Sequence, residues 1–133
     1  MYLLDTNIVS ELRRQKPHGA VVAWIASIPE SALFIPAIVF QELQAGVELT
    51  RPRDPDKAIQ IQLWIDDLAA SASVIEIDAE IARETARLMH ARSAEIYEDA
   101  VIAASARVKG MTVVTRNVRD FGAFGVELLN PFG

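Results

Sequence analysis

The sequence predicts an α/β fold with three layers, in which helices cover both faces of a central parallel sheet of about four to five strands. Short apolar runs typical of buried strands alternate along the whole chain with longer segments whose apolar residues recur at helical spacing. Such alternation favours parallel strands joined by helical crossovers. The 133 residues contain no repeat, no low-complexity segment and no long linker, so we expect a single domain over residues 1–133.

The first half of the chain is expected to supply two strands and four helices. Pro17, Pro36 and Pro55 separate these segments, and Pro55 is well placed to begin a helix. The polar residues that follow the first strand suit a helix cap. The expected elements are a strand over Tyr2–Leu4, helices from Asp5 through Leu12 and from Val21 to near Pro29, a strand over Ala32–Ile35, and helices over Ile38–Val47 and Pro55–Leu68.

The second half is expected to continue the alternation. Asp78 is a good cap for a helix from Ala79 to about Ser93, and Gly110 ends the next helix, which begins at Asp99. The small residues of that second helix suit close packing against a sheet. The expected strands are Ser73–Ile77, Met111–Val114 and a short last strand over Val126–Leu129.

Composition excludes several kinds of site. The chain has no cysteine, which rules out disulfides, zinc–thiolate centres and thiol nucleophiles, and its two histidines are too few for a histidine cage. The N-terminus has no basic segment typical of a signal peptide, and no apolar run approaches the roughly 20 residues of a membrane span. We therefore expect a soluble cytoplasmic protein.

The charge balance is unfavourable for a nucleic-acid enzyme. The net charge is −5, whereas a phosphate backbone is attracted to positive surface. Two bound divalent ions would add +4 and leave −1. Arginines occur in local groups, Arg13 with Arg14, Arg51 with Arg53 and Arg116 with Arg119, and each pair alone is best interpreted as solvated surface.

Four acids occupy distinctive places in the predicted order of elements. Asp5, Glu42, Asp99 and Asp120 each follow a strand-like run or fall near the start of a helix. Judged singly, each has an ordinary explanation as a cap, a turn residue or an exposed helix acid. Together they fall on the edge of the sheet where strands end and helices begin, which is where ligands bind in α/β folds. Carboxylates gathered there repel each other unless a cation lies among them, so the pattern predicts a site for a hard divalent metal.

Four sequence blocks surround these acids, namely Leu4–Asn7, Ile38–Gly46, Glu98–Ala104 and Thr115–Phe121. In this order and spacing they resemble the PIN-domain family and, more closely, the VapC-type ribonuclease toxins of type II toxin–antitoxin modules. The resemblance covers essentially the whole chain, down to the segment from Gly125 to Pro131.

The resemblance implies a metal-dependent endoribonuclease whose acidic set is Asp5, Glu42, Asp99 and Asp120. It also implies that Thr115 and Asn117 support the fourth acid and that Asn7 lies directly behind the metal-binding acids.

One segment departs from the family pattern. Many relatives carry a Gly-Arg-Pro-like turn before the third acid, whereas this chain has Ala91–Tyr97 there. Glu95 and Glu98 are therefore nearby competitors for the third position. Asp99 is preferred because the matching block begins at it, and Glu98 is interpreted as a solvated acid at the start of the helix.

The expected cofactor is Mg²⁺ or Mn²⁺, because both ions prefer carboxylate oxygens and water and readily bridge to phosphate. On this hypothesis Asp5 and Asp99 bind metal most directly, while Glu42 and Asp120 complete the shell or orient water. Water activated by a metal would leave 5′-phosphate and 3′-hydroxyl ends. One ion and two ions both remain compatible with the sequence.

Three other functions are alternatives for a chain with acids at one edge of a sheet. A phospho-accepting receiver domain needs paired acids after the first strand and a late lysine, but here Asp5 stands alone and Lys109 comes before its strand. A haloacid-dehalogenase-like phosphatase needs an aspartate where Asn7 stands. The third alternative is a catalytically silent PIN-fold module that binds RNA or protein. The expected partners of the toxin are an RNA substrate, a VapB-like antitoxin that covers the acidic edge, and a second copy in a homodimer. No membrane partner is expected.

Overall fold

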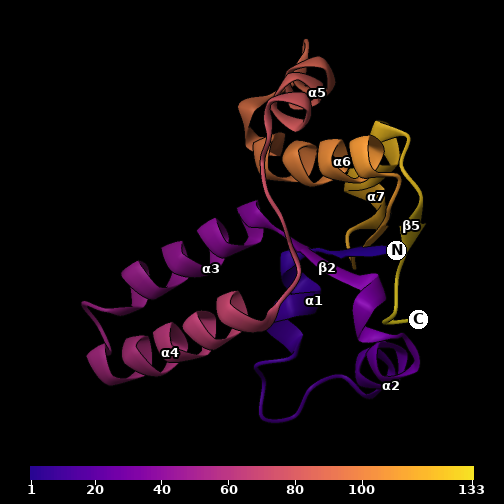
Figure 1. Cartoon of the computed structure of the whole chain (residues 1–133). Coiled ribbons are helices and arrows are strands. Elements are labelled where there is room, and N and C mark those ends of the chain that lie inside the picture. Colours follow the sequence, from indigo (N-terminus) through magenta and orange to yellow (C-terminus); the bar gives the residue numbers. More distant parts are fainter.

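A parallel sheet of five strands forms the centre of the protein. The computed structural model describes residues 1–133, and Figure 1 shows how its elements are arranged. The strands are β1 (Tyr2–Leu4), β2 (Leu33–Pro36), β3 (Val74–Ile75), β4 (Thr112–Val114) and β5 (Leu128–Leu129). Their order in the sheet is β3-β2-β1-β4-β5, and every neighbouring pair is parallel. The predicted α/β class and parallel sheet are thereby confirmed.

Helices connect the strands and cover both faces of the sheet (Figure 1). They are α1 (Thr6–Glu11), α2 (Gly19–Ser27), α3 (Ala37–Thr50), α4 (Pro55–Ser71), α5 (Ala79–Met89), α6 (Tyr97–Lys109) and α7 (Val118–Phe121). Short 3₁₀ turns occupy Glu30–Ala32, Ala94–Ile96 and Gly122–Phe124. None of these helices is long and apolar enough to cross a membrane.

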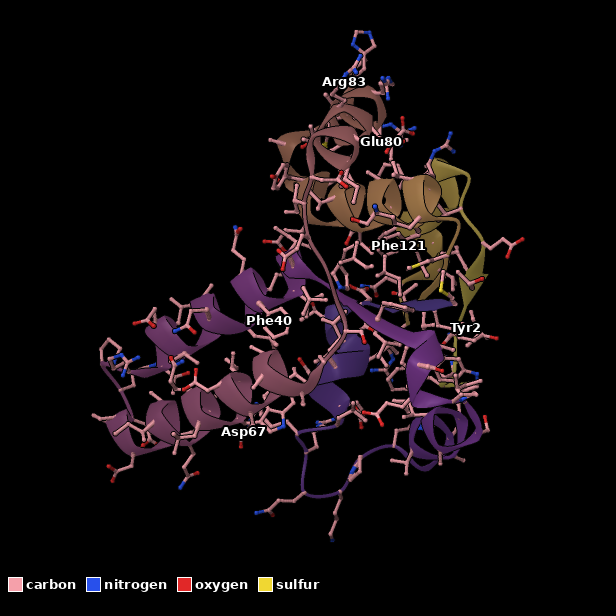
Figure 2. The ribbon with its side chains drawn as sticks, in the orientation of Figure 1. Tyr2, Phe40, Asp67, Glu80, Arg83 and Phe121 are labelled. Atoms are coloured by element: carbon pink, nitrogen blue, oxygen red, sulfur yellow. The ribbon has the colours of Figure 1, made fainter.

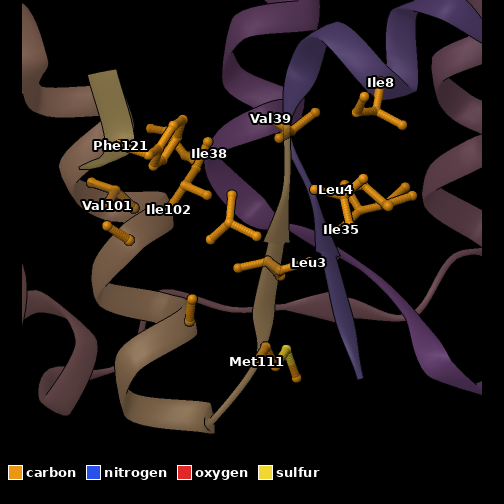
Figure 3. Packing of buried hydrophobic residues seen from close by; sticks show 14 of the residues in the cluster. Leu3, Leu4, Ile8, Ile35, Ile38, Val39, Val101, Ile102, Met111 and Phe121 are labelled. Carbon is orange, nitrogen blue, oxygen red and sulfur yellow. The ribbon is translucent and has the colours of Figure 1, made fainter. Parts of the chain in front are cut away.

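The core lies on both sides of β1. Leu3 and Leu4 are neighbours in this strand and point to opposite faces, yet both are buried. Figure 3 shows Val101 and Ile102 of α6 on one side of the strands and Ile8 of α1 on the other. Every residue of α6 from 100 to 106 is buried, and most are alanine, so this helix approaches the sheet closely.

Helices α3 and α4 form a hairpin that extends from the sheet as an arm (Figure 1). Val47, Ala58 and Ile65 make a small second core between them, and Phe40 packs against it (Figure 2). At the turn, Asp54 Oδ1 accepts a hydrogen bond of 3.1 Å from the backbone N–H of Lys57 and thereby caps α4.

Several predicted boundaries change. The helix that follows Asp78 ends at Met89 instead of near Ser93, because His90 leaves the helical backbone and Ala91 adopts a φ of 60°. The two edge strands are shorter than expected, since each has only one neighbour to pair with. The helical turn α7 was not predicted. Gly110 does end α6 in the left-handed conformation, with a φ of 67°.

Candidate active site

The fold brings the predicted acids to the carboxyl edge of the sheet. Asp5 directly follows β1, and Glu42 lies in the second turn of α3, which begins directly after β2. Asp99 is in the first turn of α6, and Asp120 lies in α7 just beyond the end of β4. We call these four residues the acidic edge.

Asp5 is the most tightly held of the four. Its carboxylate is buried, with 4% of the residue exposed. Oδ1 accepts a hydrogen bond of 2.7 Å from the backbone N–H of Thr6, so that Asp5 also caps α1. Oδ2 accepts bonds of 2.7 Å from the Thr115 hydroxyl and 3.1 Å from the Asn7 amide. Burial raises the pKa of Asp5, and these three hydrogen bonds oppose the rise.

Thr115 and Asn7 orient the first acid. Thr115 is fully buried, and its Oγ1 also accepts hydrogen bonds from the Asn7 amide at 3.4 Å and the backbone N–H of Asn117 at 2.9 Å. The resemblance implied that Thr115 supports the fourth acid, but its hydroxyl donates to Asp5 instead. Asn117 contacts the fourth acid only through its backbone carbonyl, which accepts from the N–H of Asp120 at 3.2 Å.

Glu42 and Asp99 lie in the negative field of the other acids. The pKa of Glu42 is raised to about 7, first by burial and then by the charges of Glu98 and Asp5, while the nearby Thr6 hydroxyl lowers it. The pKa of Asp99 is raised to about 6 by burial and by the charges of Asp5, Asp120 and Glu98. The acids are therefore close enough to repel each other, although they come from four separate elements.

Glu98 also contributes to the negative field at the acidic edge, although the sequence predicted only a solvated acid there. It is exposed, as interpreted from the sequence, yet its charge raises the pKa of Asp5, Glu42 and Asp99 alike. Glu95 contributes to none of these shifts. The signal for Glu98 was its position directly before Asp99 in the first turn of α6. Thr6 was also missed, although it lies directly after the first acid.

The chemistry of the acidic edge suits a hard cation. No lysine, arginine or histidine forms an ion pair with any of its four carboxylates. The four side chains offer only oxygen atoms as metal ligands, and oxygen ligands are those that Mg²⁺ and Mn²⁺ prefer. The buried Oγ1 of Thr6 is near enough to Glu42 to lower its pKa but forms no hydrogen bond of good geometry with it, which leaves this polar group for a ligand or its water. No three acids or histidines are already arranged to hold an ion, so water or substrate oxygens would complete the shell.

The fold agrees with comparisons to known proteins. The PIN domain family matches residues 2–125. The chain belongs to the PIN domain family.

The protein is 34% identical to the VapC ribonuclease Y4jK of Sinorhizobium fredii, over 99% of this chain and 98% of that protein. It is 31% identical to toxin FitB of Neisseria gonorrhoeae, over 99% of both chains. A solved structure of FitAcB from Neisseria gonorrhoeae superposes with a TM-score of 0.80 at 30% identity, over 99% of both chains.

Proposed function

We propose that this PIN domain protein is an endoribonuclease toxin of a type II toxin–antitoxin module, which hydrolyses RNA phosphodiester bonds at a Mg²⁺ or Mn²⁺ site. The observation that carries the proposal is the acidic edge, where carboxylates that repel each other meet with no basic side chain to neutralise them. The ribonuclease and toxin names of two relatives that cover nearly the whole chain support it.

In this proposal Asp5 and Asp99 bind the metal most directly, and Glu42 and Asp120 complete its shell. When bound, the ion supplies a Lewis acid that acidifies a water molecule and neutralises charge on the phosphate. The residues around Asp5 hold its carboxylate in one orientation, because donors from Thr6, Asn7 and Thr115 fix both oxygens. That orientation is set before substrate arrives, so binding requires little reorganisation of the first acid.

The same proposal assigns the partners. Residues 1–133 act as one PIN domain in the cytoplasm, as a homodimer, and a VapB-like antitoxin binds across the acidic edge. The overall charge of −5 suits a basic segment of the antitoxin, which could pair with the acids in place of the metal.

Cleavage of a mixed cellular RNA pool by the purified, antitoxin-free protein tests this function. The reactions contain Mn²⁺, Mg²⁺ or excess chelator, and an Asp99→Asn variant runs beside the wild type. We expect cleavage that requires metal, leaves 5′-phosphate ends and is lost in the variant. RNA that stays intact with the wild type under both metals would instead favour a silent binding module, and 2′,3′-cyclic phosphate ends would contradict activation of water.

A further inference from the structure

Two cavities lead away from the acidic edge along the α3–α4 arm. The inner cavity, of about 300 Å³, lies beside Thr6 and Glu42. The outer cavity, of about 710 Å³, lies between the first half of α4 and the segment Arg13–Gln15. Arg13 and Lys57 line both cavities, so the two form one continuous groove that begins at the acidic edge.

Arg13 and Lys57 are the cations of the inner cavity. Arg13 comes from the segment between α1 and α2, and Lys57 from the first turn of α4, so the fold joins positions that are distant in sequence. Neither side chain forms an ion pair, whereas Arg14, the neighbour of Arg13, is paired with Glu11 at 3.3 Å. Two unpaired cations therefore line the same cavity, next to Glu42 of the acidic edge.

The inner cavity has the charge that a phosphate requires. Glu42 is its only acid, and it belongs to the acidic edge. The outer cavity adds Arg14 together with Asp54 and Asp56, so basic side chains outnumber acids in each cavity. A phosphate bound in the inner cavity would lie next to Glu42 of the acidic edge.

Gly46 keeps this cavity open. It lies in the middle of α3, where glycine costs roughly 1 kcal/mol of stability relative to alanine. No packing contact explains that cost, since a Cβ built at Gly46 meets nothing within 4 Å. The residue lines the inner cavity, where a larger side chain would project into the groove.

We propose that Arg13 and Lys57 bind the RNA phosphate adjacent to the one that is cut, within the inner cavity. This inference rests on the proposed ribonuclease function. The two side chains position the strand and do not take part in bond cleavage. Their role is electrostatic, so it depends on salt, and it requires the open space that Gly46 leaves in α3.

Binding and cleavage of a labelled single-stranded RNA test the inference separately. Affinity is measured in the Asp99→Asn background with chelator, where we expect the strand to remain intact, over a range of salt concentrations. Arg13→Gln and Lys57→Gln should each weaken binding about tenfold and reduce the slope of log affinity against log salt by about 0.7, as expected when one contact to a single strand is lost. In the active protein the same changes should raise KM with little effect on kcat.

Two further variants separate the groove from general effects. Arg83→Gln removes an exposed, unpaired arginine in the middle of α5, far from the groove (Figure 2), and should leave affinity unchanged. Gly46→Leu should keep or raise the melting temperature, because leucine favours helix, yet weaken RNA binding by filling the cavity.

The outcomes distinguish the subsite from the function. If the wild type cuts RNA in a metal-dependent manner but Arg13→Gln and Lys57→Gln bind as Arg83→Gln does, the subsite is overturned and the ribonuclease stands. If the wild type neither cuts nor binds RNA, both proposals fail. Weaker binding by all three charge variants to the same extent would also overturn the subsite, because it would reflect net charge alone.

Discussion

Two groups of acids in this protein show opposite electrostatics. At the acidic edge, burial and neighbouring carboxylates raise the pKa of Glu42 to about 7. On the α5 side, Glu84 receives hydrogen bonds from Arg107 at 2.8 Å and from Arg87 at 3.0 Å, and these arginines lower its pKa. Asp78 is paired with Lys109 at 3.3 Å, and its pKa is also lowered, chiefly by the backbone N–H of Ile81.

The difference shows which acids the chain pairs with basic side chains and which acids it leaves without such a partner. The paired acids join α5 to α6 and need nothing from outside. The acids of the edge are held together by the fold although they repel each other, a cost that a bound cation would remove. Strongly shifted pKa values of this kind are typical of functional sites, and paired acids of structural ones.

We expect the rate of RNA cleavage to show the largest difference between the two groups of acids. Glu42→Gln removes a charge from the acidic edge, and we expect RNA cleavage to fall by about 100-fold or more, a loss typical for removal of one group that stabilises the transition state. Glu84→Gln removes a carboxylate of similar size from the α5 side and should leave the rate unchanged. Single-turnover cleavage of a labelled RNA measures both. Equal losses in the two variants would contradict the assignment of the site.

The stability of the metal-free protein should depend on pH through the acidic edge. The pKa of Glu42 rises from 4.5 to about 7 and that of Asp99 from 3.8 to about 6 in the folded state. The folded protein therefore binds more protons than the unfolded chain over this range, and its stability falls as pH rises from about 4 to 7. Glu42 is only half-buried, so solvent screening reduces its contribution to about 1 kcal/mol.

Thermal unfolding in chelator between pH 5 and 8 measures this effect. Wild type should lose about 4 °C in melting temperature across the range, whereas a Glu42→Gln, Asp99→Asn double variant should lose much less. The paired acids do not confound this window, because carboxyls with lowered pKa lose their contribution only at more acidic pH. Mg²⁺ or Mn²⁺ should restore the wild-type loss at pH 7.5 and act weakly on the double variant. A flat wild-type profile would argue against the repulsion.

The sequence predicted the acidic edge better than its surroundings. Asp5, Glu42 and Asp99 could be located because they directly follow strands or begin helices, and parallel topology brings such positions to one edge. The partner of Thr115 could not be predicted, since its bond to Asp5 depends on the pairing of β1 with β4. Arg13 and Lys57 share a cavity only because the α3–α4 arm folds back beside α1. The sequence carries no local signal for that contact.

The smallest effect should appear on the paired side. Glu84→Gln removes both ion pairs to Arg87 and Arg107, and because these arginines are largely exposed we expect a loss of about 0.5 kcal/mol in the free energy of unfolding. Salt screens such pairs, so the difference between variant and wild type should shrink at 1 M NaCl, where the Debye length is only about 3 Å. Chemical denaturation at low and high salt measures it.

Glu42→Gln should shift stability in the opposite direction, because removing one negative charge from the edge relieves repulsion. If both substitutions destabilised the metal-free protein, the acidic edge would be a structural ion network like the one beside α5, and the contrast between the two groups would be lost.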